Sequence, residues 1–135
     1  DSATAIVTVL DTVNPAVVAQ NLTVYLDASG NAIITAADID NGSADNCSSI
    51  TLAIDSANFD CSEVGANNVK LYVTDASSNI DSASALVTVL DTLKPTVIAQ
   101  NIAIYLDATG NATITAADID GGSADNCSSI NLPYG

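Results

Sequence analysis

Residues 36–50 read AADIDNGSADNCSSI and residues 116–130 read AADIDGGSADNCSSI, so one loop occurs twice with a single change, Asn41 to Gly121. The two copies are 80 positions apart, and residues 1–50 match residues 81–130 at 38 of 50 positions. Such similarity between neighbouring segments is typical of a tandem array of one structural unit. The sequence therefore predicts a whole module and part of a second, cut from a longer array.

Short runs of β-branched and other small apolar residues recur along the chain, separated by polar turns. The pattern predicts strands over residues 3–10, 17–26, 32–36, 49–54, 59–64, 68–74 and 83–90. In one run Val69, Leu71 and Val73 alternate with polar residues, which predicts that these three side chains point inward. No segment has a convincing helical period. Short strands with turns about every eight to twelve residues favour an all-β fold of tandem immunoglobulin-like β-sandwich modules.

The module boundary is predicted at the linkers DTVNP (residues 11–15) and DTLKP (residues 91–95), where proline restricts the backbone. Residues 1–10 would then be the last strand of a preceding module, 11–90 a complete immunoglobulin-like module, and 91–135 the N-terminal part of a second, truncated module. Half a sandwich cannot bury its apolar face. It is expected to need more chain or a strand from a neighbouring copy, which would make a homopolymer. An export signal is expected outside these residues.

The charge balance is strongly acidic. Asp and Glu together number 16 against two lysines, and the formal net charge is −14. This charge excludes nucleic acid and anionic membrane surfaces as partners. No run of apolar residues is long enough for membrane insertion, yet 48% hydrophobic residues suffice for a folded core.

The complete module contains two cysteines, Cys47 and Cys61, and neither belongs to a zinc-binding pattern. We expect a disulfide between them, worth about 3 kcal/mol in the chain-entropy model, with buried free thiols as the alternative. Cys127 is the repeat equivalent of Cys47. Its partner is expected one repeat after Cys61, beyond Gly135, which would leave Cys127 unpaired. Disulfide use favours a secreted, oxidising location.

Aspartates are concentrated in the repeated loop and at the module ends, and Ca²⁺ prefers clustered oxygen ligands on loops of small residues. In an immunoglobulin-like sandwich this loop, the hairpin after residue 74 and the entry linker share one end. The predicted calcium ligands are Asp11, Asp38, Asp40 and Asp75, with Asp45, Asn79 and Asp81 as weaker candidates, and Asp91, Asp118, Asp120 and Asp125 in the copy. The alternative is that the acidic loops only keep the protein soluble and form turns.

The sequence also bears on two other functional classes, a carbohydrate-binding module and an enzyme. Tyrosines can stack on sugars, and the candidates are Tyr25, Tyr72, Tyr105 and Tyr134. An enzyme is not expected, because the chain has no histidine and no recognisable nucleophile–base arrangement.

Residues 58–69 (NFDCSEVGANNV) and 73–79 (VTDASSN) resemble the hyalin-repeat (HYR-like) type of immunoglobulin-like module. With the DNC motif at residues 45–47 and the DTxxP linkers, the chain looks like the tandem repeats of giant secreted adhesins of gliding bacteria. It departs from the family pattern by lacking a second cysteine pair and by having Ser78 where glycine is usual. The resemblance implies a secreted, cell-surface protein that acts in adhesion or surface extension, often with its ligand site elsewhere on the chain.

The function predicted from these observations is a structural repeat segment of a surface adhesin or filament, a calcium-stiffened spacer in adhesion or gliding. Its expected partners are the neighbouring modules of the same chain and a surface glycan or another cell-surface ligand. The alternative is a carbohydrate-binding β-sandwich module.

Overall fold

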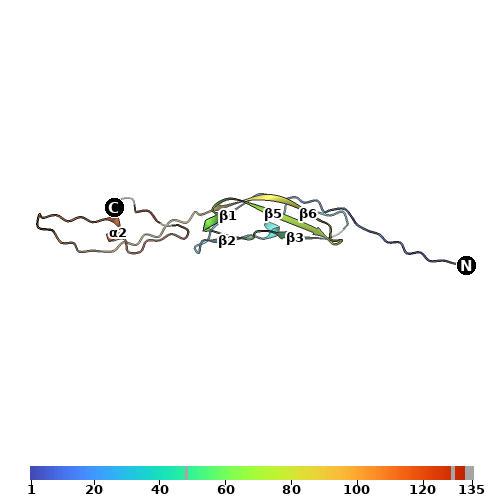
Figure 1. Cartoon of the computed structure of the whole chain (residues 1–135), viewed down its shortest axis with the longest axis horizontal. Helices are drawn as coiled ribbons and strands as arrows, with labels where there is room; N and C mark the ends of the chain where they lie inside the picture. The colour runs from blue at the N-terminus through green and yellow to red at the C-terminus, as the bar shows by residue number, and fades with distance from the viewer. Residues whose placement is uncertain (48, 129, 133–135) are drawn as a thin grey trace.

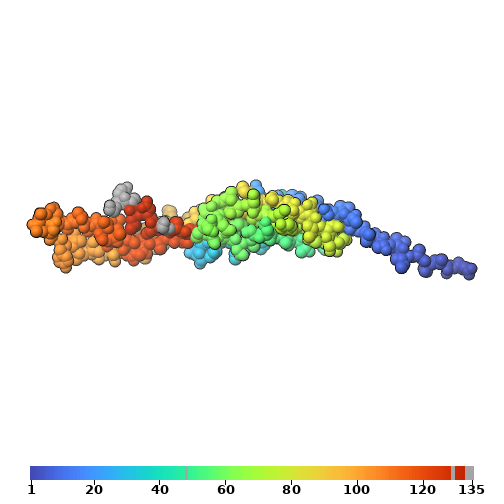
Figure 2. All heavy atoms as spheres, in the orientation of Figure 1, coloured from blue at the N-terminus to red at the C-terminus, as the bar shows by residue number. Residues whose placement is uncertain are grey.

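The structure, a computed structural model, describes residues 1–47, 49–128 and 130–132. The chain is elongated, with its sheets in the middle (Figure 1). Residues 1–10 extend from one end as a thin tail, and the second copy of the repeat forms the other end (Figure 2).

The regular elements of the described residues lie mainly between positions 22 and 90. The strands are β1 (Leu22–Tyr25), β2 (Asn31–Ile33), β3 (Ile50–Ile54), β4 (Asn58–Asp60), β5 (Gly65–Asp75) and β6 (Ile80–Leu90), and the helices are α1 (Ala36–Ile39), η1 (Cys61–Glu63, 3-10) and α2 (Ala116–Ile119). Four strands form a sheet in the order β1-β6-β5-β3, and β2 pairs with β4 in a second sheet. The β1–β6 pair is parallel and the other pairs are antiparallel. The prediction of an all-β fold is confirmed at this level.

The core is built on the alternation of β5 and β6. Val69, Leu71 and Val73 are at most 1% exposed, so the prediction that this face points inward is confirmed. Val87 and Val89 of β6 are fully buried beside them. The same cluster also includes Ala85 of β6, Phe59 of β4, Ile39 of α1, and Leu26 and Ile34 from the segments between strands. Side chains of both sheets therefore share one core.

Two predicted strand regions behave differently from their repeat equivalents. Residues 3–10 correspond to residues 83–90 of β6 but form no strand, and Ile6 is 94% exposed. β6 forms because it pairs with β5 and β1, whereas no segment of the described chain pairs with residues 3–10. In the second copy, residues 96–124 form only isolated bridges and α2 within the described chain.

Candidate functional site

Three aspartates that are distant in sequence converge where β5 ends. Asp11, Asp45 and Asp75 each offer one carboxylate oxygen, and these oxygens lie within 4.8 Å of one another. Asp11 opens the linker, Asp45 follows the backbone bridge between Ala16 and Ala44, and Asp75 is the last residue of β5. The linker, the repeated loop and the end of the sheet thus each contribute one carboxylate to this aspartate cluster.

Asp75 is 6% exposed, and the turn after β5 holds its carboxylate. Its Oδ1 accepts hydrogen bonds of 2.8 Å from the backbone N–H groups of Ser77 and Asn79, and its Oδ2 accepts one of 2.8 Å from Asn79 Nδ2. Burial raises the pKa of the Asp75 carboxyl, but the hydrogen bonds from Asn79 and the backbone of the turn outweigh it, so the pKa lies below its usual value. Asp75 is therefore a carboxylate at neutral pH.

Asp11 is fixed to the same turn through its backbone. Its carbonyl oxygen accepts a hydrogen bond of 3.1 Å from Asn79 Nδ2, and its Oδ1 accepts one of 3.1 Å from the N–H of Val13. Its Oδ2 is buried and has no hydrogen-bond partner in the described chain. A buried carboxylate oxygen without a donor is unfavourable unless a cation or water compensates it.

The cluster has the charge and spacing of a site for a hard cation. Two like charges at about 4 Å repel by about 1 kcal/mol in water and several times that near a protein surface. Oxygen ligands lie roughly 2.3 to 2.6 Å from Ca²⁺, so oxygens that share one ion can be nearly 5 Å apart. The unpartnered Oδ2 of Asp11 and the 4.8 Å limit within the cluster fit this requirement.

Asp38 and Asp40 were predicted as ligands, but the structure uses them inside their own loop. Asp38 Oδ2 accepts hydrogen bonds from the backbone N–H and the hydroxyl of Thr35, at 2.7 and 2.8 Å, and so begins α1. Asp40 Oδ1 accepts from the N–H of Ser43 at 3.0 Å. Hydrogen bonds from Thr35 lower the pKa of Asp38, and those from Ser43 lower the pKa of Asp40. Neither residue belongs to the aspartate cluster, which Asp45 completes instead.

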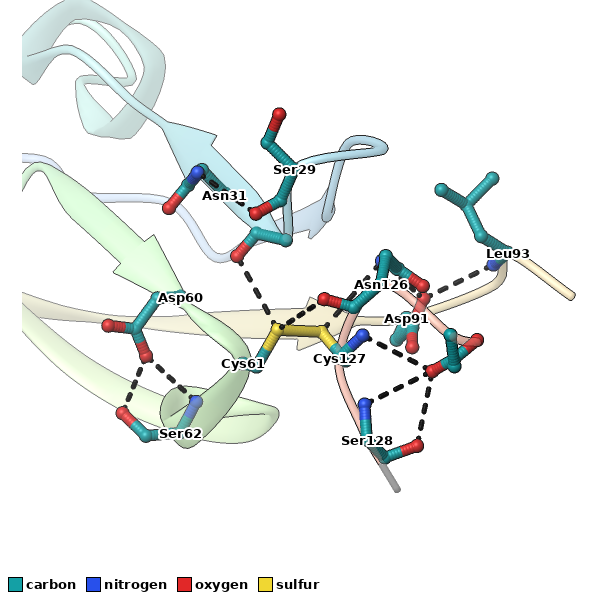
Figure 3. The surroundings of a disulfide bond; sticks show 12 residues. Ser29, Asn31, Asp60, Cys61, Ser62, Asp91, Leu93, Asn126, Cys127 and Ser128 are labelled. Atoms are coloured by element: carbon teal, nitrogen blue, oxygen red, sulfur yellow. Dashed lines mark hydrogen bonds between the residues drawn. A yellow bond between two sulfur atoms is a disulfide. The ribbon is translucent and has the colours of Figure 1, made fainter. Parts of the chain in front are cut away.

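In the second copy the predicted ligands are placed in the same way. Asp118 accepts from the N–H of Thr115 at 2.7 Å, and Asp120 accepts from the N–H of Ser123 at 2.9 Å, as in the first copy. Asp91, the equivalent of Asp11, accepts a hydrogen bond from Asn126 Nδ2 (Figure 3). Asp125, the equivalent of Asp45, accepts one from the N–H of Cys127.

The disulfide differs from the prediction. Cys61 is bonded to Cys127, and Cys47 is a free, exposed cysteine. The predicted Cys47–Cys61 pair and the predicted free Cys127 are therefore wrong. The prediction assumed that the cysteine loop is paired within its own repeat, whereas the loop of the second repeat reaches back to the first (Figure 3).

The contact around this disulfide has two faces, which we call the plug and the socket. The plug consists of Asp91, Asn126 and Cys127, and the socket consists of Asp27, Gly30 and Cys61. Asn126 Nδ2 donates to the carbonyl oxygen of Asp27 at 3.1 Å and to Asp91 Oδ1 at 3.2 Å. Gly30 is buried here, at a φ of +76°, and a Cβ on it would lie 2.6 Å from Cys61 Sγ and 2.9 Å from the Asn126 carbonyl oxygen. The socket therefore requires glycine at this position.

The tyrosines proposed for sugar contact are dispersed. Tyr25 of β1 is 59% exposed, and Tyr105 of the second copy is 88% exposed. Tyr72 of β5 lies under Lys70, whose Nζ is 5.5 Å from the ring centroid. Tyr134 lies outside the described residues. These positions belong to different elements, so the described tyrosines form no common platform.

We find no protein-family model that matches the chain and no curated protein with significant similarity to it. Among the described residues, no helix is long and apolar enough to cross a membrane.

Proposed function

We propose that the chain is a segment of a tandem array of immunoglobulin-like β-sandwich modules in a secreted surface adhesin or filament, where it acts as a calcium-stiffened spacer. One observation carries the proposal: a linker, a loop and a sheet end each contribute a carboxylate to one cluster, Asp11, Asp45 and Asp75. A cation held by all three would fix the linker to the sheet and so limit bending at the module entrance.

Three further observations support this proposal. The 80-residue repeat and the resemblance to hyalin-repeat modules favour an array. The disulfide favours an oxidising, extracellular location. The second repeat is bonded to the first through side chains as well as through the linker, which suits a protein whose units must keep a fixed arrangement.

Thermal unfolding with calcium and with chelator tests the metal. A ligand at 100 times its dissociation constant stabilises a protein by about 2.7 kcal/mol, which corresponds to a rise in Tm of several degrees. We expect this rise with Ca²⁺ in the unmodified chain and its loss in Asp75→Asn and Asp11→Asn. The control is Asp55→Asn, which removes the same charge from an exposed position directly after β3 and outside the cluster.

The control should keep the full calcium response. An equal response in all four proteins would place the ion elsewhere, and no response in any of them would remove calcium from the proposal. In that case an acidic, soluble tandem repeat would remain.

A further inference from the structure

The plug of the second repeat has a counterpart in the first repeat that has the same local geometry. Asp11, Asn46 and Cys47 are equivalent to Asp91, Asn126 and Cys127, and we call them the upstream plug. In both copies the cysteine N–H donates to the preceding aspartate, at 3.0 Å to Asp45 and 3.2 Å to Asp125. In both copies the asparagine Nδ2 lies 3.8 Å from the cysteine sulfur.

The rest of the loop agrees as well. The bridges of the first copy, Ala16 to Ala44 and Ala19 to Asp40, recur one repeat later as Thr96 to Ala124 and Ala99 to Asp120. The four-residue helices α1 and α2 begin at equivalent positions. The loop therefore adopts one conformation in both copies, whether or not its cysteine is bonded.

Burial separates the two plugs. Asn126 and Cys127, which are docked, are half-buried, whereas Asn46 and Cys47 are exposed. The socket shows the reciprocal difference. Gly30 is buried against the plug, whereas its equivalent Gly110 has the same left-handed backbone, a φ of +81°, but is exposed, and a Cβ on it would meet nothing within 4 Å. Each repeat thus carries one plug and one socket turn, and only the inner pair is joined in this chain.

From this symmetry we propose that the upstream plug docks into the socket of a preceding unit of the same kind and that Cys47 forms a disulfide with that unit's equivalent of Cys61. This inference rests on the proposed tandem array. The occupant is defined by the joined pair: a turn equivalent to residues 27–31, with glycine at the position of Gly30 and a cysteine at the position of Cys61. In the array each unit would then be tied to the next by two covalent connections, the peptide linker and a disulfide.

The chemistry is an ordinary oxidation of two thiols. Oxidised glutathione, a low-molecular-weight disulfide, first forms a mixed disulfide with one cysteine and releases one reduced glutathione. The thiolate of the other cysteine then attacks the protein sulfur of that mixed disulfide, the new S–S bond forms, and a second reduced glutathione leaves. Two protein thiols lose two electrons and two protons, and glutathione takes up both.

The test uses the full chain extended by one unit, residues 1–90 followed by residues 11–135, which preserves the repeat period. The first unit carries Cys47→Ser, so that four cysteines remain. After refolding with reduced and oxidised glutathione, free thiols are alkylated and located by mass spectrometry. We expect no free thiol, because second-unit Cys47 pairs with first-unit Cys61 and second-unit Cys61 pairs with Cys127.

A matched variant carries first-unit Cys61→Ser in addition to first-unit Cys47→Ser, so that three cysteines remain, and it identifies the partner. We expect one free thiol in it, on second-unit Cys47. If second-unit Cys47 instead pairs with Cys61 of its own unit, the free thiol will be on Cys127. Mass spectrometry distinguishes the two peptides, because the Cys127 peptide has Gly121 where the Cys47 peptide has Asn41. A free thiol on Cys127 would overturn the inference. Alkylation of second-unit Cys47 in the extended chain itself, or disulfide-linked dimers through Cys47, would also overturn it.

A second measurement does not depend on removing a cysteine. Gly30→Ala in the first unit of the extended chain should slow the closing of this disulfide about tenfold, since the new Cβ would collide with the socket sulfur. An unchanged rate would contradict the docking. The calcium experiment is independent of these thiols, so a free Cys47 in a chain that still responds to calcium would refute this inference and leave the spacer proposal standing.

Discussion

At the scale of single residues, two glycines in equivalent turns separate backbone strain from contact between repeats. Gly30 and Gly110 both have a positive φ, which costs a residue with a Cβ about 1 to 2 kcal/mol. Only at Gly30 would the Cβ also lie 2.6 Å from a sulfur. We therefore expect Gly30→Ala to destabilise the protein by about 1 to 3 kcal/mol more than Gly110→Ala.

Urea unfolding of both variants under oxidising conditions measures this difference. The comparison should be repeated with Cys127→Ser added to each variant. This change removes the disulfide and so separates the effect of packing at Gly30 from the effect of the covalent bond. Equal losses in the two variants would mean that the plug is not packed against Gly30 in solution.

The same scale shows which parts of the site could be read from the sequence. Asp11 and Asp75 were predicted to meet because they lie at a linker and at a strand end. Within the loop, the sequence favours Asp38 and Asp40 over Asp45 as ligands, whereas Asp45 is the loop residue in the cluster. All three are aspartates of one short loop, so composition does not distinguish them. A local signal did exist: Thr35 stands three residues before Asp38, and this spacing commonly marks the first turn of a helix. The disulfide partner had no such signal, because Cys47 and Cys127 lie in identical local sequences and differ only in what adjoins them.

At the scale of elements, the core depends on the buried face of β5. Leu71 belongs to β5, the strand between β6 and β3, and its side chain is fully buried. Leu71→Ala should therefore destabilise the protein by about 2 to 5 kcal/mol. Ile33 of β2 is 75% exposed, and Ile33→Ala should change stability by about 0.5 kcal/mol or less. Chemical denaturation of the two variants measures the difference. Similar losses of stability in Leu71→Ala and Ile33→Ala would mean that the inward face of β5 is not the buried core of the protein.

Strand alternation predicted this face of β5 correctly, because period-2 burial is a local property of a strand between two neighbours. The same reasoning failed for residues 3–10. Their sequence is nearly that of β6, yet strand formation requires partners that supply backbone hydrogen bonds, and no described segment pairs with them. Strand propensity can be read from a short segment, whereas pairing depends on the rest of the molecule.

At the scale of the whole molecule, aspartates with lowered pKa values determine how the stability of the protein depends on pH. Asp38, Asp60 and Asp75 have pKa values below the usual range, through hydrogen bonds from Thr35, from Ser62, and, against the effect of burial, from Asn79. A carboxyl whose pKa is lower in the folded state adds stability above its unfolded pKa, about 3.9, and this stability is lost as the pH falls through the folded value.

Two effects therefore oppose each other when the protein is acidified. Protonation removes these hydrogen-bonded carboxylates, which destabilises the fold, but it also relieves repulsion within a chain of net charge −14. At 0.15 M salt the screening length is about 8 Å, so repulsion between distant charges is weak while hydrogen bonds of about 3 Å are unaffected. With chelator present, we expect the free energy of unfolding to change little between about pH 5 and 7 and to fall below about pH 4. Asp60→Asn removes one titrating group. Its free energy of unfolding, measured with urea from pH 2 to 7, should fall less steeply on acidification than that of the unmodified chain. A stability that rises steadily toward pH 2 would mean that repulsion, rather than the local hydrogen bonds of the loops, dominates the electrostatics of this protein.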